Sequence, residues 1–320
     1  MSSNPSGRRY AVVTTCHAAG YETYGRTMIE TFLAHWPAEV PLLLYHEGFE
    51  PPMAPGRIEA HDLMAACPGL VDFKRRHAGN PRANGQRPRW RPVRLGSLVM
   101  TLPLPLRTPS YRWDAVRFAH KSYAVFDAAR RTDADVLIWI DADTRFFADV
   151  SLAELAVLAP VQSAVACLRR PDFTETGFVA YNLRHPETPR LLAEFEAMYA
   201  GDLLFAEREY TDCWLFDIAR ARAEARGAHV HDIAEGAGRE RSHVLADSRL
   251  GAFMDHLKGD RSRPAPSAMS WTCAPRASAR ARTMSNSQQS VYSRSANRRS
   301  PAYIASNSAS SRGVSGWRRL

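Results

Sequence analysis

The sequence lacks a long apolar run. In the 320 residues, every apolar run is much shorter than the roughly 18 residues that a membrane-spanning helix needs. We therefore expect no transmembrane segment. The first residues, Met1 to Arg9, are polar and predict no signal peptide. Cysteine is scarce, because only five residues occur and their spacing is not that of a metal site. These absences predict reduced thiols and a cytoplasmic location.

Acidic residues are absent from the last part of the chain. From Arg263 to Leu320 there are ten Arg and fourteen Ser but no Lys, Asp or Glu. Subtracting these ten charges from the net charge of +9 leaves about −1 for residues 1–262. Residues 1–262, called the body below, therefore have no net positive field of the kind that nucleic-acid binding needs. We expect no nucleic-acid partner.

The composition of residues 263–320 cannot bury enough apolar surface to offset the entropy of ordering, which predicts a disordered Arg/Ser-rich tail. Two origins of the tail stay open. It could be functional and bind RNA or anionic surfaces, or it could be out-of-frame translation of a GC-rich gene, a composition that also suggests a bacterial source.

Strands and helices are predicted to alternate before the tail. Tyr10–Thr15 and Val40–Tyr45 have the pattern of strands, and they enclose a loop through Gly20 and a helix from Thr27 to Trp36. Nucleotide-binding α/β half-domains begin in this order. We therefore predict one α/β domain over residues 8–262, with a central, mostly parallel sheet flanked by helices.

The alternation continues after an interruption. Residues 74–113 are rich in Arg, Pro and Gly without a clear period, which predicts a large irregular loop near the rim of an active site, either a lid or a tolerated insertion. Beyond it, helical or strand patterns cover the following segments: helices at 113–131, 152–158 and 189–200 and after Asp212, and strands at 136–140, 163–168 and 174–182.

One strand ends in a pair of carboxylates. Val136–Ile140 is entirely apolar, as in a strand buried on both faces, and Asp141 and Asp143 follow at once. Ligands of open α/β sheets bind beyond the carboxyl ends of the strands. Paired carboxylates there suit a divalent cation that also holds substrate phosphates. An acidic turn in which Asp143 caps the next element is the alternative, but the position directly after an uncharged strand favours a metal site.

Two cations precede this strand on the predicted helix. Arg117 and Lys121 are four residues apart and so share one helix face. Beside a carboxylate–metal site, such a pair suits a diphosphate. The alternative is a solvated face on which Arg117 pairs with Asp114.

A further carboxylate, Asp212, lies between the aromatic residues Tyr210 and Trp214, which stack on sugar rings in some proteins or simply pack. It could accept a proton from an acceptor hydroxyl, or it could be an ordinary helix N-cap.

The body ends in a group that fits a phosphate site. His256 can bind a metal through neutral imidazole, Lys258 supplies a point charge, and Gly259 lets the backbone approach a phosphate. A surface or core histidine is the alternative for His256. The two carboxylates Asp141 and Asp143 favour the metal-binding interpretation.

Together these segments resemble the GT-A glycosyltransferases, which use nucleotide-diphosphate sugars. The resemblance covers about residues 8–262. It rests on Ala11–Thr15, Arg117–Lys121, Ile138–Asp143, Glu175–Phe178 and His256–Gly259. The last is similar to the His-x-x-Gly segment that completes the metal site in some of these enzymes, although Asp260 and the tail replace the basic and aromatic positions that usually follow.

The resemblance implies a metal-dependent glycosyltransferase of the hexosyltransferase type (EC 2.4), which transfers a sugar to a hydroxyl of a saccharide or another acceptor. It also implies roles for single residues. Asp143, Asp141 and His256 would bind Mn²⁺ or Mg²⁺, Thr14 and Thr15 would lie beside the base and ribose, Glu175 and Gly177 would approach the donor sugar or acceptor, Arg117, Lys121, Lys258 and Gly259 would hold the diphosphate, and Asp212 would be the base or bind the acceptor.

Two other functions stay open. Sugar-1-phosphate nucleotidyltransferases have a similar fold, but they carry a glycine-rich, basic phosphate loop after the first strand, whereas Cys16–Tyr21 has one Gly and no Lys or Arg. A non-catalytic or RNA-binding protein that acts through the basic tail is the second alternative, and removal of the tail would then abolish salt-sensitive RNA binding.

Overall fold

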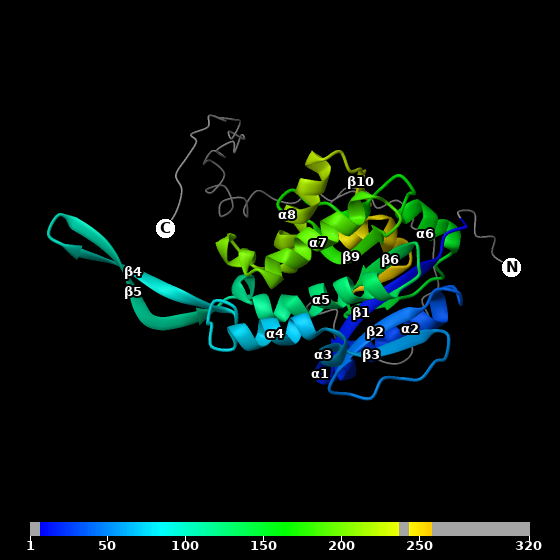
Figure 1. The fold of residues 1–320 in the computed structure, drawn as a ribbon, viewed down its shortest axis with the longest axis horizontal. Helices are drawn as coiled ribbons and strands as arrows, with labels where there is room; N and C mark the ends of the chain where they lie inside the picture. Colours follow the sequence, from blue (N-terminus) through cyan, green and yellow to red (C-terminus); the bar gives the residue numbers. More distant parts are fainter. Residues whose placement is uncertain (1–6, 237–242, 258–320) are drawn as a thin grey trace, which may run out of the picture. The chain divides into compact units, whose positions relative to one another are not determined.

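A seven-stranded sheet forms the centre of the computed structural model, which describes residues 7–236 and 243–257, all within the unit Met1–Ala265. The strand order is β10-β8-β9-β6-β1-β2-β3 (Figure 1). Only β9 runs antiparallel to its neighbours, while the other four strand pairs are parallel. The predicted α/β class with a mostly parallel sheet is therefore confirmed. The bounds are β1 Tyr10–His17, β2 Leu42–Glu47, β3 Ile58–Asp62, β6 Val136–Ile140, β8 Val165–Leu168, β9 Glu175–Asn182 and β10 Val230–Asp232.

Helices cover both faces of this sheet. Leu137 and Trp139 of β6 belong to one apolar cluster, whereas Val136, Ile138 and Ile140 belong to the other. This alternation explains why every residue of β6 is apolar, since a strand covered on both faces has no solvent side. Residues of α3 Leu63–Ala66, α4 Pro68–His77, α5 Ala115–Arg131, α7 Glu187–Ala200 and α8 Asp212–Ala225 form the first cluster, and α2 Arg26–His35, α6 Leu152–Leu158 and α9 Val244–Asp247 contribute to the second.

Side-chain caps begin the helices that matter most for the site. Asp114 accepts a hydrogen bond from the Arg117 amide at the start of α5, and Thr211 accepts one from the Trp214 amide at the start of α8. Such caps satisfy amides that have no partner within the helix. The alternative of Asp212 as the N-cap is therefore wrong, because Thr211 occupies that position and Asp212 is the first residue inside α8.

The segment after β1 is helical, so the predicted loop through Gly20 is wrong. The helix α1 Ala18–Gly20 leads through the π-helical turn η1 Tyr21–Gly25 directly into α2. The His17 ring accepts a hydrogen bond from the Gly20 amide at 3.1 Å and caps the turn. The alanines that follow His17 favour helix, and they outweigh the loop signal of Gly20.

The predicted irregular loop over residues 74–113 is also wrong. The segment contains the end of α4 and then two strands, β4 Gln86–Leu95 and β5 Leu98–Pro109, that pair with each other in an antiparallel hairpin. Gly96 provides the turn with φ +63°, a conformation that glycine adopts without strain. Frequent Arg and Pro hide the two-residue period of these strands, which is why the sequence suggested no regular element. A 3-10 turn, η2 Tyr111–Trp113, follows.

A small two-stranded sheet places residues 254–256, near the end of the body, beside the central sheet. The strand β11 Met254–His256 pairs antiparallel with β7 Thr144–Phe146, which follows the two aspartates. The pairing sets His256 opposite Thr144, and the Leu257 amide donates to the Asp143 carbonyl at 2.7 Å. The remaining short turns are η3 Leu203–Ala206 and η4 Arg249–Ala252.

Within the described residues, each helix is too short or too polar to cross a membrane. The predicted tail lies outside the described residues, as do Lys258 and Gly259.

Candidate functional site

The carboxyl ends of β1 and β6 meet at the point where the sheet changes direction. From β1 the chain builds outward through β2 and β3, and it then returns to place β6 on the other side of β1. Crevices form at such topological switch points, and ligands of open α/β sheets bind there. Asp141 and Asp143 follow β6 at this edge, beside Thr15 near the end of β1.

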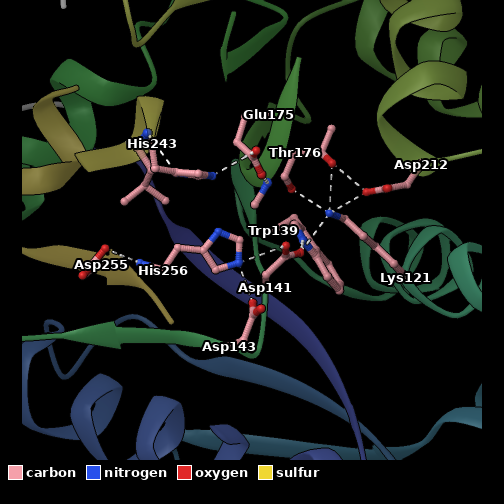
Figure 2. A network of polar contacts seen from close by, with 12 residues as sticks. Lys121, Trp139, Asp141, Asp143, Glu175, Thr176, Asp212, His243, Asp255 and His256 are labelled. Atoms are coloured by element: carbon pink, nitrogen blue, oxygen red, sulfur yellow. Dashed lines mark hydrogen bonds and ion pairs between the residues drawn. The ribbon is translucent and has the colours of Figure 1, made fainter. Parts of the chain in front are cut away.

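Three potential metal ligands converge there. The Nε2 atom of His256 lies 2.6 Å from Oδ1 of Asp143 and 3.6 Å from Oδ2 of Asp141 (Figure 2). One ligand atom of each residue lies within 4.8 Å of the others. The imidazole is fully buried, whereas both aspartates are half-buried at the surface of a cleft. The structure thus brings together the three residues that the sequence proposed as metal ligands.

The second oxygen of Asp141 is held by neighbours from the opposite side. Its Oδ1 accepts hydrogen bonds from the Lys121 ammonium at 2.9 Å and from the Trp139 indole at 2.7 Å. Two strong donors on one oxygen orient the carboxylate, so its Oδ2 faces His256.

Lys121 is the centre of a satisfied charge network. Besides Asp141, its ammonium contacts Oδ2 of Asp212 at 2.7 Å and the carbonyl oxygen of Thr176 at 2.6 Å. Burial alone would lower the pKa of Lys121, but attraction to Asp141 and Asp212 outweighs it, so the pKa is raised and the side chain stays charged. Asp212 also accepts a hydrogen bond from the Thr176 hydroxyl at 2.6 Å.

The predicted cation pair on α5 is therefore divided. Lys121 is committed to the buried carboxylate of Asp212 and the half-buried carboxylate of Asp141, whereas Arg117 is exposed and lines the cleft. The Arg117 guanidinium forms no ion pair with any described residue, and Asp114 contacts only its amide. The alternative in which Arg117 pairs with Asp114 is not seen, and Arg117 keeps its charge available to a ligand.

The other face of His256 meets a group that the sequence did not indicate. Its Nδ1 atom is buried and has no hydrogen-bond partner among the described residues. Glu175 and His243 lie on this side and form a second group of potential ligands with His256. Oε2 of Glu175 is 3.2 Å from Nε2 of His243. His243 was missed because it has no ligand-type spacing to any other residue, and only the fold brings it here.

Gly177 lies between Glu175 and His256. A Cβ atom at Gly177 would be 3.2 Å from both Oε1 of Glu175 and Cε1 of His256. Such contacts are closer than ordinary van der Waals contact, so a side chain would push the carboxylate and the imidazole apart. Gly177 thus permits the close approach of these two groups, and its approach to the donor sugar or acceptor stays a prediction.

The site carries more negative than positive charge. The carboxylates of Asp141, Asp143, Glu175 and Asp212 lie in one network (Figure 2), in which Lys121 pairs with Asp141 and Asp212 and the Arg170 guanidinium lies 3.4 Å from Glu175. A divalent cation would offset the remaining charge. The mixed set of carboxylate oxygens and an imidazole suits Mn²⁺ better than Mg²⁺, which favours oxygen ligands alone. The fit rests on Nε2 of His256, which faces Asp143 and Asp141 at 2.6 and 3.6 Å, close enough for one cation to be held by all three side chains.

Two clefts meet at Asp141 and Asp143. The larger, of about 530 Å³, lies at the ends of β1 and β2 and is lined by Thr15, His17, Tyr24, Glu47, Arg117 and His120, among others. The smaller, of about 370 Å³, lies on the far side of the two aspartates and is lined by Tyr111, Arg112, Phe173, Glu175, Glu209 and Asp212, among others. Arg117 and Phe118 border both clefts. The site thus has two clefts that share the charged residues Arg117, Asp141 and Asp143.

Several predicted contact residues take different positions in these clefts. Thr15 lines the larger cleft and donates its hydroxyl to the Tyr45 carbonyl at 2.9 Å, whereas Thr14 is buried and lines neither cleft. Successive residues of a strand point to opposite faces, which explains the difference. Tyr210 is fully buried and Trp214 lines neither cleft, so the structure does not offer these two rings to a sugar.

Three residues of the larger cleft were not identified from sequence. Glu47 ends β2 at the same edge of the sheet as the aspartates. Burial, followed by the neighbouring Cys16 and Asp143, raises the pKa of the Tyr24 hydroxyl. Burial and the nearby Lys74 lower the pKa of His120, so its ring is neutral near pH 7. The end of a predicted strand was the one signal that could have indicated Glu47.

No protein-family model matches the sequence, and no curated protein matches it. Among solved structures, the chain is similar to mouse xyloside xylosyltransferase 1 in its apo form, with 12% identity over 80% of this chain and 99% of that chain and a TM-score of 0.44. It is similar to the apo bifunctional glycosyltransferase WbbM, with 13% identity, 81% and 47% coverage and a TM-score of 0.43. It thus spans about half of the WbbM chain.

A third similar structure is a glycosyltransferase involved in glycosylation of the major capsid of PBCV-1, with 11% identity, 79% and 96% coverage and a TM-score of 0.40. These proteins are glycosyltransferases by name, the class that the sequence resembles.

Proposed function

We propose that this protein is a metal-dependent glycosyltransferase of the hexosyltransferase type (EC 2.4), which transfers a sugar from a nucleotide-diphosphate donor to an acceptor hydroxyl. The observation that carries the proposal is the convergence of Asp141, Asp143 and His256 between two clefts at the switch point of the sheet. Transfer of a sugar from a nucleotide donor to an acceptor needs one cleft for each substrate, with the charged centre between the two clefts.

The larger cleft suits the donor nucleotide. Its floor is formed by the ends of β1 and β2, where Thr15 and Glu47 offer polar atoms to a base or ribose. Arg117 stands where the two clefts meet, and its planar guanidinium can bind phosphate oxygens with two parallel hydrogen bonds. A donor laid along this cleft would place its diphosphate beside Asp141 and Asp143.

The smaller cleft suits the acceptor. Tyr111 and Phe173 provide aromatic surface, and Glu175, Glu209 and Asp212 provide carboxylates that can accept hydrogen bonds from sugar hydroxyls. A role for Asp212 as base would use Oδ1, because Oδ2 is engaged by Lys121 and Thr176.

The chemistry requires stabilisation of negative charge on the departing nucleoside diphosphate. A cation held by Asp141, Asp143 and His256, preferably Mn²⁺, would supply this as a Lewis acid. Arg117 would add a second positive charge from the protein. Lys121 orients Asp141 through its contact with Oδ1, while Lys258 and Gly259, outside the described residues, remain proposed contacts of the diphosphate.

Thermal unfolding with a panel of nucleoside diphosphates, each with and without Mn²⁺, tests the proposal. A ligand that binds only the folded protein adds about 2.7 kcal/mol at 100 times its Kd, which is readily measured. We expect a shift that requires both one nucleotide and the metal, and that disappears in Asp143→Asn. The nucleotide that gives the shift identifies the base of the donor.

A matched control is Asp149→Asn, which makes the same change at an exposed carboxylate bonded to His35 rather than in the site. This variant should keep the full nucleotide-dependent shift. If no nucleotide stabilises the wild-type protein in the presence of Mn²⁺, the donor site does not exist and the proposed function is wrong.

A further inference from the structure

The β4–β5 hairpin has no partner in the described part of the chain. Its strands of 10 and 12 residues pair only with each other (Figure 1). Its base is anchored, because the Ser110 amide donates to the Gly85 carbonyl at 2.7 Å and the Gly85 amide donates to the Trp113 carbonyl at 3.0 Å. A two-stranded hairpin alone is marginally stable in water, so a ribbon of this length gains from a surface that covers it.

Apolar side chains project from both faces of the hairpin tip. Leu98, Val99 and Met100 follow the turn and have exposed fractions of 56%, 54% and 43%. Successive residues of a strand point to opposite faces, so Val99 faces away from Leu98 and Met100. A protein groove that receives a flat ribbon covers one face, whereas a lipid layer surrounds an inserted tip on both.

The hairpin is also strongly basic. Residues 86–109 contain five arginines, at positions 87, 89, 91, 94 and 107, and no Asp or Glu. Removing these five charges from the net −1 of residues 1–262 leaves about −6 for the rest. Arg94 is exposed and pairs in register with Val99 at the tip. Arginine beside inserted apolar side chains can reach lipid phosphates, because its aliphatic stem lies along the apolar surface.

Two other partners fit less well. A second copy of the chain could add a strand to the hairpin edge, but prolines at positions 88, 92, 103, 105 and 109 remove backbone donors from both strands, and proline disfavours such edge pairing. A basic two-stranded ribbon can also enter the major groove of DNA, but apolar side chains on both faces of the tip would have no phosphate or base partner there.

We propose that the β4–β5 hairpin docks the protein on an anionic lipid bilayer. Leu98, Val99 and Met100 enter the boundary between headgroups and acyl chains, Arg94 beside them contacts the headgroup phosphates, and the charges of Arg87 and Arg107 further along the strands attract the anionic surface. Because this proposal rests on the hairpin alone, it stands or falls separately from the proposed glycosyltransferase activity.

Sedimentation of the full chain with lipid vesicles tests this inference. We expect binding to phosphatidylcholine vesicles that contain roughly a third phosphatidylglycerol, and much weaker binding to phosphatidylcholine alone. The triple variant Leu98→Ser, Val99→Ser, Met100→Ser should reduce partitioning by about tenfold or more, since it removes the inserted apolar surface. A second variant, Arg87→Gln, Arg94→Gln, Arg107→Gln, should lose the preference for anionic vesicles while keeping the apolar tip.

The matched control replaces three apolar residues that are more exposed than Leu98 but lie outside the hairpin, by Met53→Ser, Val161→Ser and Leu203→Ser. It should partition as the wild type does, and all variants should keep the wild-type melting temperature.

Three results would overturn the proposal. In the first, the tip variant binds anionic vesicles as well as the wild type, which would assign binding to another segment such as the Arg-rich tail. In the second, the wild type does not bind vesicles but sediments as a dimer that the tip variant splits, which would identify a second copy as the partner. In the third, the arginine variant loses binding to duplex DNA while vesicles are not bound, which would identify nucleic acid.

Discussion

The polar network in Figure 2 has two halves that differ in how well their charges are satisfied. In the lysine half, the Lys121 ammonium contacts four oxygen atoms of Asp141, Thr176 and Asp212 at 2.6 to 3.2 Å. In the histidine half, the buried Nδ1 of His256 lacks a hydrogen-bond partner among the described residues, although Glu175 and His243 are near.

This difference distinguishes residues that support the fold from residues that are available to a ligand. Buried polar groups in folded proteins normally have partners, and an exception indicates an ion, a water or a functional role. The lysine half meets this requirement with its own residues, so it is complete without a ligand. In the histidine half, Nδ1 of His256 is left unpartnered among the described residues, while Nε2 faces two half-buried carboxylates where a cation would bind. We therefore expect substitutions in the lysine half to affect folding first, and those in the histidine half to affect binding and turnover first.

The largest effect is expected from Asp143→Asn in the histidine half. Loss of this carboxylate weakens the cation site and should lower kcat/KM by about 10³-fold, the scale of losing a main source of charge stabilisation. The melting temperature should stay close to that of the wild type, because Asp143 is half-buried at a cleft and its ion-pair partner is a histidine. Steady-state kinetics and thermal unfolding measure the two quantities, and full turnover by this variant would disprove the metal-site argument.

Lys121→Met, in contrast, should have its main effect on the free energy of unfolding rather than on kcat/KM. It leaves the buried carboxylate of Asp212 and the half-buried carboxylate of Asp141 without their cation, and breaking a buried ion pair from one side typically costs about 3–5 kcal/mol of unfolding free energy. Denaturant unfolding measures this loss. The control Lys74→Met, at a more exposed lysine that lies 3.5 Å from Glu47, should cost about 1 kcal/mol or less.

A double variant sharpens this test. Adding Asp212→Asn to Lys121→Met removes one of the two stranded charges, so the double variant should be more stable than the sum of the single losses predicts. Equal stability of Lys121→Met and the wild type would mean that the lysine half is not a structural element.

A smaller effect is expected from Glu175→Gln. The Glu175 carboxylate lies on the Nδ1 side of His256 without a hydrogen bond to that atom. Its negative charge there favours a proton on Nδ1, which leaves Nε2 available toward Asp143. Loss of a carboxylate that orients a metal-binding histidine typically weakens metal affinity by about 10–100-fold. Titration calorimetry with Mn²⁺ alone, without donor or acceptor, measures the affinity.

The control for this variant is Glu209→Gln, because Glu209 is buried in the same cleft but pairs with Arg112 rather than lying beside His256. It should leave Mn²⁺ affinity unchanged. An equal loss of affinity in both variants would show that the net charge of the cleft, and not the orientation of His256, determines metal binding.

Much of the fold could be predicted from local pattern. The apolar run of β6 and the striped helices α5 and α7 show their structure in consecutive residues, and the structure confirms them. Elements without such a pattern were missed. The strand β3 lies at the edge of the sheet and is largely polar, and the hairpin β4–β5 hides its period behind Arg and Pro.

The candidate site divides in the same way. The sequence by itself determined the two carboxylates at the end of a buried strand, because an apolar run and the residues that follow it are contiguous. Tertiary structure decided which residues face them. His256 reaches Asp143 across 113 positions through the pairing of β11 with β7, and Lys121 turns to Asp212 while Arg117 stays exposed. Local periodicity specifies an element, but only the packing of elements specifies which distant side chains share a buried charge.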